Sequence, residues 1–373
     1  MHSIQSPFRY DYVGSFLRPE SLKKARKEFE AGRLTAGQLK EEEDRAIRDL
    51  VRKQKQAGYH VITDGEFRRS TWHLDFMWGC SGVGHHATER GLPFHHEAAM
   101  IDDTYLTGRL SCGTKPHPFV EHFRFIKALE DEQTVAKQTI PAPAQFLEQL
   151  IMPMNLEGTR KFYPDQEELI QDLAAVYRKV IADLYAAGCR NLQFDDCTWG
   201  CFVDPSAPLF FGTDEAGLLK LQQEFLRINN LAMEGKPEDL VITTHICRGN
   251  FHSTWACTGA YDKIADLVFG KEKVQALYLE FDDERSGSFE CLSKVSEDKK
   301  VVLGLVTTKN PKLEDKEAVI ERIHEAARYI PLDRLYLSPQ CGFASCEVGN
   351  KLTEEEQWAK LRLVKEIAEE VWG

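Results

Sequence analysis

The sequence lacks several features that would each indicate a particular class of protein. Its 47 lysine and arginine residues form no clustered basic tract, and the net charge is -12. Because nucleic-acid binding needs a concentrated basic face, nucleic acid is not expected as a partner. No run approaches the roughly 18 apolar residues of a membrane span, and the first residues resemble no secretory leader. We therefore expect a cytoplasmic protein without a membrane partner.

Internal repeats, low-complexity linkers and Pro/Ser-rich boundaries are also absent. This absence predicts one catalytic domain spanning residues 1–373. The ten cysteines could suggest disulfides, but such frameworks are typical of shorter secreted chains, so thiols are expected here. No G-x-G-x-x-G follows a predicted strand, which argues against a dinucleotide-binding fold.

Short β-branched runs alternate with longer amphipathic segments along the chain, as in βα units around a parallel sheet. Eight such strands predict an α/β protein with a (β/α)8 (TIM) barrel fold. An open doubly wound sheet is the alternative, although it normally has fewer strands. The predicted strands are residues 10–16, 60–66, 136–143, 191–196, 240–247, 276–281, 300–308 and 335–342.

The stretch at about 67–134, between strands 2 and 3, is too long for a simple connection between a strand and a helix. It includes the Gly/His-rich segment GCSGVGHHATERGLPFHHE. We expect an inserted excursion that forms a hairpin over one end of the barrel.

Four metal-ligating side chains are predicted to meet at the barrel mouth. His245 and Cys247 are two residues apart on one strand, so they point to the same face. Glu280 closes the sixth predicted strand and Cys341 closes the eighth, and the active sites of this fold lie at the carboxyl ends of the strands. One His, two Cys and a carboxylate suit Zn²⁺, which accepts nitrogen, sulfur and oxygen ligands.

Several short motifs, taken together and in order, resemble the catalytic domain of cobalamin-independent methionine synthase and its shorter single-domain relatives. This family belongs to the same broad superfamily as uroporphyrinogen decarboxylase. The motifs are V-G-S at 13–15, D-G-E at 64–66, Q-F-D-D at 193–196, T-H-I-C at 244–247, the strand ending at Glu280, and S-P-Q-C-G at 338–342.

The resemblance implies a zinc-dependent methyltransferase that activates the thiol of homocysteine and forms methionine. A free thiol with a pKa near ~8.5 is mostly protonated at neutral pH, whereas a metal-bound thiol is ionised and can attack a methyl group. Position in the family assigns Glu66 and Asp195 to the substrate ammonium group. It assigns the backbone N–H groups of Gly14 and Ser15 to the substrate carboxylate.

Two departures from the longer enzymes leave the methyl donor open. Thr307 and Lys309 stand where those enzymes have Asp and His, so the usual proton donor to the leaving group is replaced. Lys309 is the candidate to take that catalytic role, with a solvated loop charge as the alternative. The donor could be methyltetrahydrofolate, a methylated corrinoid or a small molecule.

Two other functions stay open at this stage. One is a different zinc-dependent thiol alkyltransferase of the superfamily, which would open an epoxide or use another thiol. The other is a metal-free decarboxylase-like barrel or a zinc-binding protein without catalysis. The oligomeric state is also open, with a homo-oligomer among the states that the sequence allows.

Overall fold

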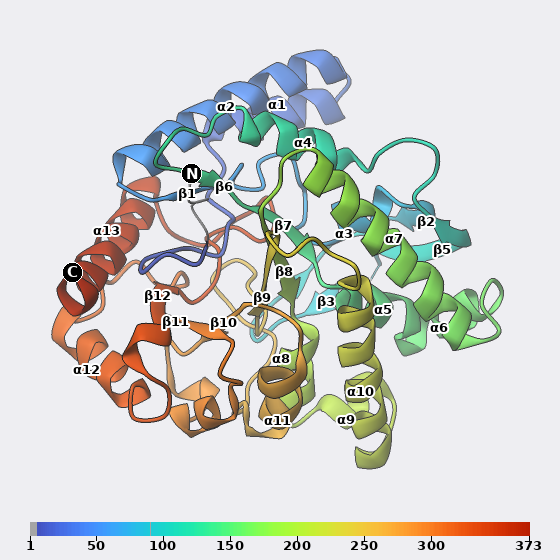
Figure 1. Ribbon diagram of the computed structural model, residues 1–373. Coiled ribbons are helices and arrows are strands. Elements are labelled where there is room, and N and C mark those ends of the chain that lie inside the picture. Colours follow the sequence, from blue (N-terminus) through green and yellow to red (C-terminus); the bar gives the residue numbers. More distant parts are fainter. Residues whose placement is uncertain (1–5, 90) are drawn as a thin grey trace.

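The computed structural model, which describes residues 6–89 and 91–373, is an α/β protein built on a parallel sheet with helices around it (Figure 1). Its six main strands lie in sequence order, and all their pairings are parallel. They agree closely with six of the predicted segments. These strands are β7 (Gln138–Pro141), β8 (Asn191–Asp196), β9 (Val241–Ile246), β10 (Ala276–Glu280), β11 (Lys300–Val306) and β12 (Leu335–Pro339).

Short parallel contacts connect the two ends of this sheet. β1 (Val61–Ile62) pairs with β6 (Val135–Ala136), which continues after one residue into β7. At the other end, Tyr10 forms a parallel bridge to Leu337 of β12. A backbone hydrogen bond of 3.1 Å from Phe16 to Gly65 links the first segment to the turn after β1. These contacts are consistent with the predicted (β/α)8 barrel.

The first two predicted strands are much shorter in the structure than the sequence indicates. Residues 10–16 contribute a single bridge, and residues 60–66 contribute only the two residues of β1. Gly14, Gly65 and Glu66 have φ values of 151°, 65° and 62°, which lie outside the β region. The backbone therefore leaves the ladder at these positions and turns toward the carboxyl ends of the strands.

Capping residues mark both ends of the second helix. Thr35 and Gln38 form a capping box at the start of α2 (Ala36–Gln56), and Gly58 follows its end with φ 83°. No helix within residues 6–89 and 91–373 is long and apolar enough to cross a membrane. The other long helices are α1 (Glu20–Glu30), α7 (Gln166–Ala186), α10 (Glu215–Ala232), α11 (Asp262–Lys271), α12 (Lys316–Ala326) and α13 (Glu354–Trp372).

The stretch at 67–134 contains antiparallel strand pairs, as expected of a hairpin excursion. β2 (Ser81–His86) pairs with β5 (Asp103–Ser111), and β3 (Leu92–Pro93) pairs with β4 (Ala98–Ala99). The stretch also contains α3 (Leu74–Trp78), and its last part is α4 (Pro118–Lys127), which packs against α7 and β6.

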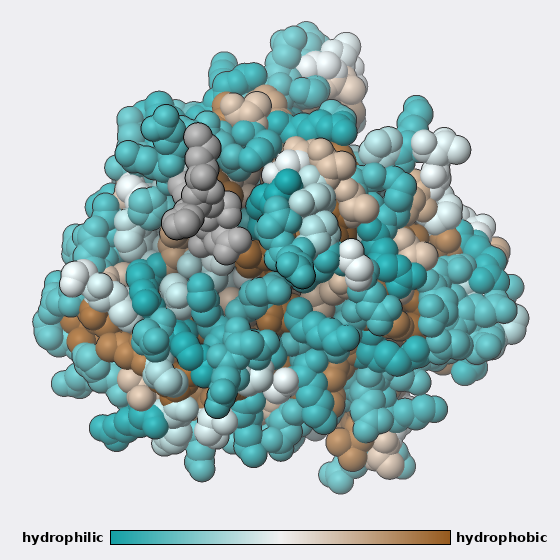
Figure 2. Space-filling model, viewed as in Figure 1, coloured by the Kyte–Doolittle hydropathy of each residue, from teal (hydrophilic) through white to brown (hydrophobic). Residues whose placement is uncertain are grey.

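Apolar side chains fill the space between the sheet and the surrounding helices in one large cluster. A small second cluster of Ala276, Tyr278, Val302 and Tyr336 comes from alternate positions of β10, β11 and β12. The face of the molecule in Figure 2 is mostly hydrophilic, with apolar residues in scattered groups. The apolar core therefore lies between the sheet and the helices. Polar side chains such as Asp195, His245 and Glu280 lie at the carboxyl ends of the strands.

Candidate metal centre and its pocket

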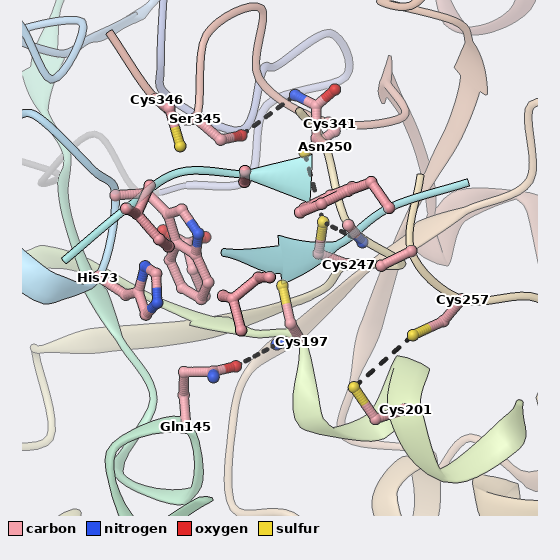
Figure 3. Close-up of a pocket in the computed structure, with 18 of the residues that line it drawn as sticks. His73, Gln145, Cys197, Cys201, Cys247, Asn250, Cys257, Cys341, Ser345 and Cys346 are labelled. Atoms are coloured by element: carbon pink, nitrogen blue, oxygen red, sulfur yellow. Dashed lines mark hydrogen bonds between the residues drawn. The ribbon is translucent and has the colours of Figure 1, made fainter. Parts of the chain in front are cut away.

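Four buried side chains from β9, the residue after it, β10 and the segment after β12 bring their donor atoms together. The ligand atoms of His245, Cys247, Glu280 and Cys341 all lie within 4.8 Å of one another. The sulfur atoms of Cys247 and Cys341 are 3.6 Å apart (Figure 3). A tetrahedral zinc site with bonds of about 2.0–2.3 Å requires similar spacings between ligands. The predicted set is thus the one that the fold assembles.

Their unpaired hydrogen-bonding atoms suit a bound cation. Neither ring nitrogen of His245 has a hydrogen-bond partner, and Oε2 of Glu280 has none either, although these atoms are buried. Such orphaned polar atoms are costly unless something else satisfies them. Imidazole nitrogen, two sulfurs and a carboxylate oxygen form a donor set that zinc accepts. Within the described ranges this is the only group of three or more such residues close enough to share an ion.

The loop after β9 holds the ligands through its backbone. Gly249 N–H donates to the sulfur of Cys247 at 3.3 Å, and Arg248 N–H donates to Oε1 of Glu280 at 3.3 Å. Tyr261 O–H accepts from Glu280 N–H at 3.0 Å. These contacts orient the thiol and the carboxylate in the absence of a metal.

A pocket of about 380 Å³ opens above the four side chains. His245, Cys247 and Cys341 form part of its wall, and β3, β4 and the turn between them cover it through Leu92, Phe94 and Ala99 among others. The inserted excursion therefore contributes to the site. No lysine or arginine in the described ranges lines this pocket, whereas four acids do: Glu66, Glu148, Asp195 and Asp204.

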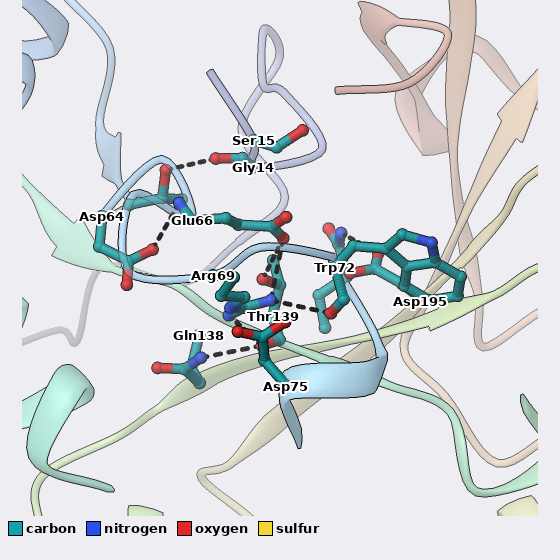
Figure 4. Close-up of polar contacts among 12 residues, drawn as sticks. Gly14, Ser15, Asp64, Glu66, Arg69, Trp72, Asp75, Gln138, Thr139 and Asp195 are labelled. Carbon is teal, nitrogen blue, oxygen red and sulfur yellow. Dashed lines mark hydrogen bonds and ion pairs between the residues drawn. The ribbon is translucent and has the colours of Figure 1, made fainter. Parts of the chain in front are cut away.

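Two of these acids belong to the predicted substrate set. Oε1 of Glu66 accepts from Thr139 Oγ1 at 2.8 Å and forms an ion pair with Arg69 at 3.1 Å (Figure 4). Its Oε2 is buried without a partner. Asp195 accepts a hydrogen bond of 2.7 Å from Gln193. Burial, followed by the charge of Glu66, raises the pKa of Asp195 well above its usual range, and burial raises that of Glu66.

The predicted carboxylate-binding segment lies at the same mouth. Ser15 lines the pocket, while Gly14 lies beside it. A Cβ added at Gly14 would come within 2.8 Å of Thr139 Cγ2, and φ of 151° is itself unfavourable for other residues. Ser15 Oγ accepts from Ala344 N–H at 3.3 Å. Gly14 thus allows the close backbone approach that places Ser15 in the wall.

Comparisons with known proteins agree with this geometry. The sequence profile described as "Cobalamin-independent synthase, Catalytic domain" matches residues 159–370, which is more than half of the chain. The chain belongs to the cobalamin-independent methionine synthase family. A Bacillus subtilis relative, the uncharacterized protein YxjG, is 45% identical over 98% of this chain and 95% of its own length.

Methionine synthase from Pyrococcus abyssi, a more distant family member, is 24% identical over 88% of this chain and 84% of its own. A Listeria monocytogenes crystal structure, provisionally named a vitamin-B12-independent methionine synthase, aligns with TM-score 0.77 and 36% identity over 99% of both chains. A B12-independent methionine synthase from a Shewanella species, in complex with selenomethionine, shares the fold with TM-score 0.69 and 19% identity over 97% of both chains.

Lys309 lies close to Glu280, Cys247 and Cys341, although it does not line the pocket. Its Nζ is buried without a hydrogen-bond partner. Burial lowers the pKa of Lys309, but the negative groups around it, led by Glu280 and Asp282, raise the pKa by more. Lys309 therefore stays protonated, and its positive charge lies next to a cluster of acidic groups.

Two polar residues of this wall were not among the predicted site residues. Gln145 and Glu148 lie one turn apart on α5 (Pro143–Ile151), and both are buried and line the pocket. The available signal was an acid in a largely apolar helix, PAQFLEQLI, directly after a strand end. The histidines of the excursion separate: His95 lines the pocket and stacks on Trp255, whereas His85 and His86 are exposed on β2.

Proposed function

We propose that this chain is a (β/α)8-barrel, zinc-dependent methyltransferase that activates the thiol of homocysteine and forms methionine. The observation that carries the proposal is the buried set of His245, Cys247, Glu280 and Cys341, whose ligand atoms lie within 4.8 Å of one another beneath a pocket. Membership in the cobalamin-independent methionine synthase family supports the same reaction.

His245, Cys247, Glu280 and Cys341 would hold the metal. A bound zinc ion supplies a Lewis acid that lowers the pKa of a coordinated thiol and so makes a nucleophile available at neutral pH. The burial of all four residues excludes water from their charged groups and strengthens their electrostatic interactions.

The amino-acid end of homocysteine has a matching set of protein groups. Glu66 and Asp195 would receive the ammonium group, because both are buried carboxyl groups in the pocket wall and Glu66 Oε2 has no partner. Their mutual repulsion raises the pKa of Asp195, and a cation between them would remove that repulsion. Backbone N–H groups at Gly14 and Ser15 would hold the carboxylate. Binding both ends would fix the thiol in front of Cys247 and Cys341.

Lys309 would balance the charge of the loaded centre. Two thiolates and one carboxylate bring three negative charges to a divalent ion, which leaves one negative charge in excess. The Lys309 ammonium group is close enough to Glu280 to respond to its charge, and it has no other partner. It would thus lower the electrostatic cost of bringing a further anionic sulfur into the site.

Metal analysis combined with a panel of substrates tests the proposal. We expect about one zinc per chain by plasma mass spectrometry. Homocysteine should yield methionine with at least one of 5-methyltetrahydrofolate, a methylated corrinoid or a small methyl donor, and removal of zinc with a chelator should abolish the product. Product from coenzyme M or another thiol, with none from homocysteine, would instead indicate a different alkyltransferase. A chain that retains no zinc would contradict the proposal.

A further inference from the structure

Glu148 occupies an unusual position in the wall of the pocket. It lies on α5, whose other residues are mostly apolar, and its side chain is 3% exposed. It lines the pocket together with Cys197 and Cys201 from the segment after β8. The negative charge of Asp196 acts on Glu148 and also on Glu272, a second buried glutamate. An acid in this apolar setting has no structural partner of opposite charge, since no lysine or arginine of the described ranges lines the pocket.

Two hydrogen bonds fix which oxygen of Glu148 accepts a hydrogen bond from Gln145. Cys197 N–H donates to Oε1 of Gln145 at 3.2 Å (Figure 3). The amide orientation of Gln145 follows, because only its oxygen can accept that bond. Its Nε2 then donates to Oε2 of Glu148 at 2.7 Å. Oε2 is thus an acceptor, whereas the buried Oε1 has no nitrogen or oxygen partner, and the Cys201 thiol lies beside the carboxyl group.

The charge state of Glu148 follows from its surroundings. Burial raises its pKa to about 8, with the negative charge of Asp196 adding to the effect. The carboxyl group is therefore mostly protonated at neutral pH. Because Oε2 accepts from Gln145, the acidic proton belongs on Oε1. A neutral carboxylic acid held by burial in this way can donate a proton at pH 7.

Glu148 is also connected to the reacting sulfur atoms. The backbone of Cys197 anchors Gln145, and the thiol of the same residue contacts Cys247 of the ligand set. One continuous series of contacts thus joins the metal ligand, the segment after β8, Gln145 and Glu148. The amino-acid subsite of Glu66 and Ser15 comes from other elements, so α5 borders the part of the pocket left for the second substrate.

We propose that Glu148 donates the proton from its Oε1 to the leaving nitrogen of an N-methyl donor. This role rests on the proposed methyl transfer. The S–CH₃ bond forms as the N–CH₃ bond breaks, and the electron pair of the broken bond stays on nitrogen. Nitrogen takes the proton of Glu148, which becomes a carboxylate and regains a proton from water through the open pocket. The proton lost earlier by the homocysteine thiol balances the one consumed.

Glu148→Gln is the appropriate variant, because it keeps the shape of the side chain and an oxygen for Gln145 but cannot transfer a proton. Glu272→Gln is a matched control. Glu272 is fully buried, its pKa is also raised to about 8 by burial and Asp196, and Asn229 donates to its Oε1 at 2.9 Å. It does not line the pocket. The two variants therefore remove similar acids from different places.

The first measurement needs no turnover. Infrared difference spectra between pH 6 and pH 10 should contain the C=O stretch of a protonated carboxyl group that disappears as the pH rises through about 8. Part of this band should be missing in Glu148→Gln and another part in Glu272→Gln. A spectrum of Glu148→Gln identical to that of the wild type would overturn the proposal.

The second measurement compares two methyl donors with homocysteine. With 5-methyltetrahydrofolate, Glu148→Gln should be slower by roughly 100-fold or more, and Glu272→Gln should stay within a few-fold of the wild type. With methyl iodide, whose leaving iodide takes no proton, Glu148→Gln should match the wild type. Equal losses with both donors, or no loss with either, would contradict proton donation.

A wild-type chain that forms no methionine from 5-methyltetrahydrofolate would overturn this assignment as well. Methyl iodide would distinguish the two possible causes. If the chain formed methionine from methyl iodide, only the role of Glu148 would be contradicted. If it formed no methionine from either donor, the proposed function itself would be contradicted.

Discussion

The sulfur atoms of Cys247 and Cys341 lie 3.6 Å apart although 94 residues separate them in the chain. Cys247 follows β9 and Cys341 follows β12, so two strands that are not neighbours deliver the pair. Neither sulfur is in a disulfide. Two thiols this close, with His245 and Glu280 beside them, are the part of the molecule whose chemistry is most directly testable.

Replacing Cys247 with serine should release zinc and abolish methionine formation. The substitution removes a sulfur ligand, so the loss of zinc affinity should exceed the ~10–100-fold effect of changes in outer-shell residues. Zinc content by plasma mass spectrometry checks this. Cys112→Ser is the control, because Cys112 is half-buried, donates to the backbone oxygen of Val176 on α7 and does not line the pocket. Full zinc content in Cys247→Ser would remove Cys247 from the ligand set.

Asp195→Asn should retain zinc but bind homocysteine more weakly. A hydrogen bond to a charged group contributes about 1.5–3 kcal/mol, which corresponds to a loss of affinity of roughly 10- to 150-fold. Calorimetric titration with homocysteine measures the effect. A simple alkanethiol without an amino group is the control ligand, and its affinity should not change. If both thiols bound more weakly by the same factor, Asp195 would instead act by positioning the metal centre.

Gly200→Ala should disturb the metal centre from outside it. Gly200 lies on α8 (Thr198–Val203), and a Cβ there would lie 2.3 Å from the backbone oxygen of Cys247. Something must shift, at a cost of about 1–3 kcal/mol in the free energy of unfolding, and zinc affinity should fall with it.

Gly158→Ala is the matched control for that helix substitution. Gly158 lies on α6 (Pro153–Arg160), and a Cβ there would meet no atom within 4 Å. Alanine should stabilise the protein by about 0.5–1 kcal/mol, since it restricts the unfolded chain, and zinc content should be unchanged. Denaturant titration of both variants measures the difference. If both variants had the same stability and zinc content, the close contact between α8 and the backbone of Cys247 would not matter for the metal centre.

Lys137→Met should strongly destabilise the fold. Lys137 lies between β6 and β7, where its ammonium group is 3.1 Å from Oδ1 of Asp11, and both side chains are 0% exposed. Removing one partner leaves a buried charge unpaired and should cost about 3–5 kcal/mol. Urea denaturation checks the value. Adding Asp11→Asn should recover part of the loss; a double variant no more stable than the single one would mean that the ion pair is not the cause.

Much of the fold could be predicted from the sequence because its periodicity is local. Six of the eight predicted strands match the parallel sheet, and amphipathic helices such as α2 and α7 lie between strands, as the alternation predicts. The lengths of the strands at 10–16 and 60–66 were harder to predict. Their β-branched and aromatic residues favour strands, but Gly14, Gly65 and Glu66 have positive φ, and the backbone leaves the sheet at these positions.

The sequence by itself determined the four candidate metal ligands, because in a parallel barrel every strand end faces the same mouth and residue type then indicates the chemistry. It could not determine the place of Gln145 and Glu148. On a helix, an acid is equally compatible with solvent or with a pocket, and α5 faces the pocket only because it packs against α7, α8 and α10. The charge state of Glu148 was likewise decided by burial and by Asp196, a residue 48 positions away, since electrostatic interactions depend on distance in space and on the surrounding dielectric.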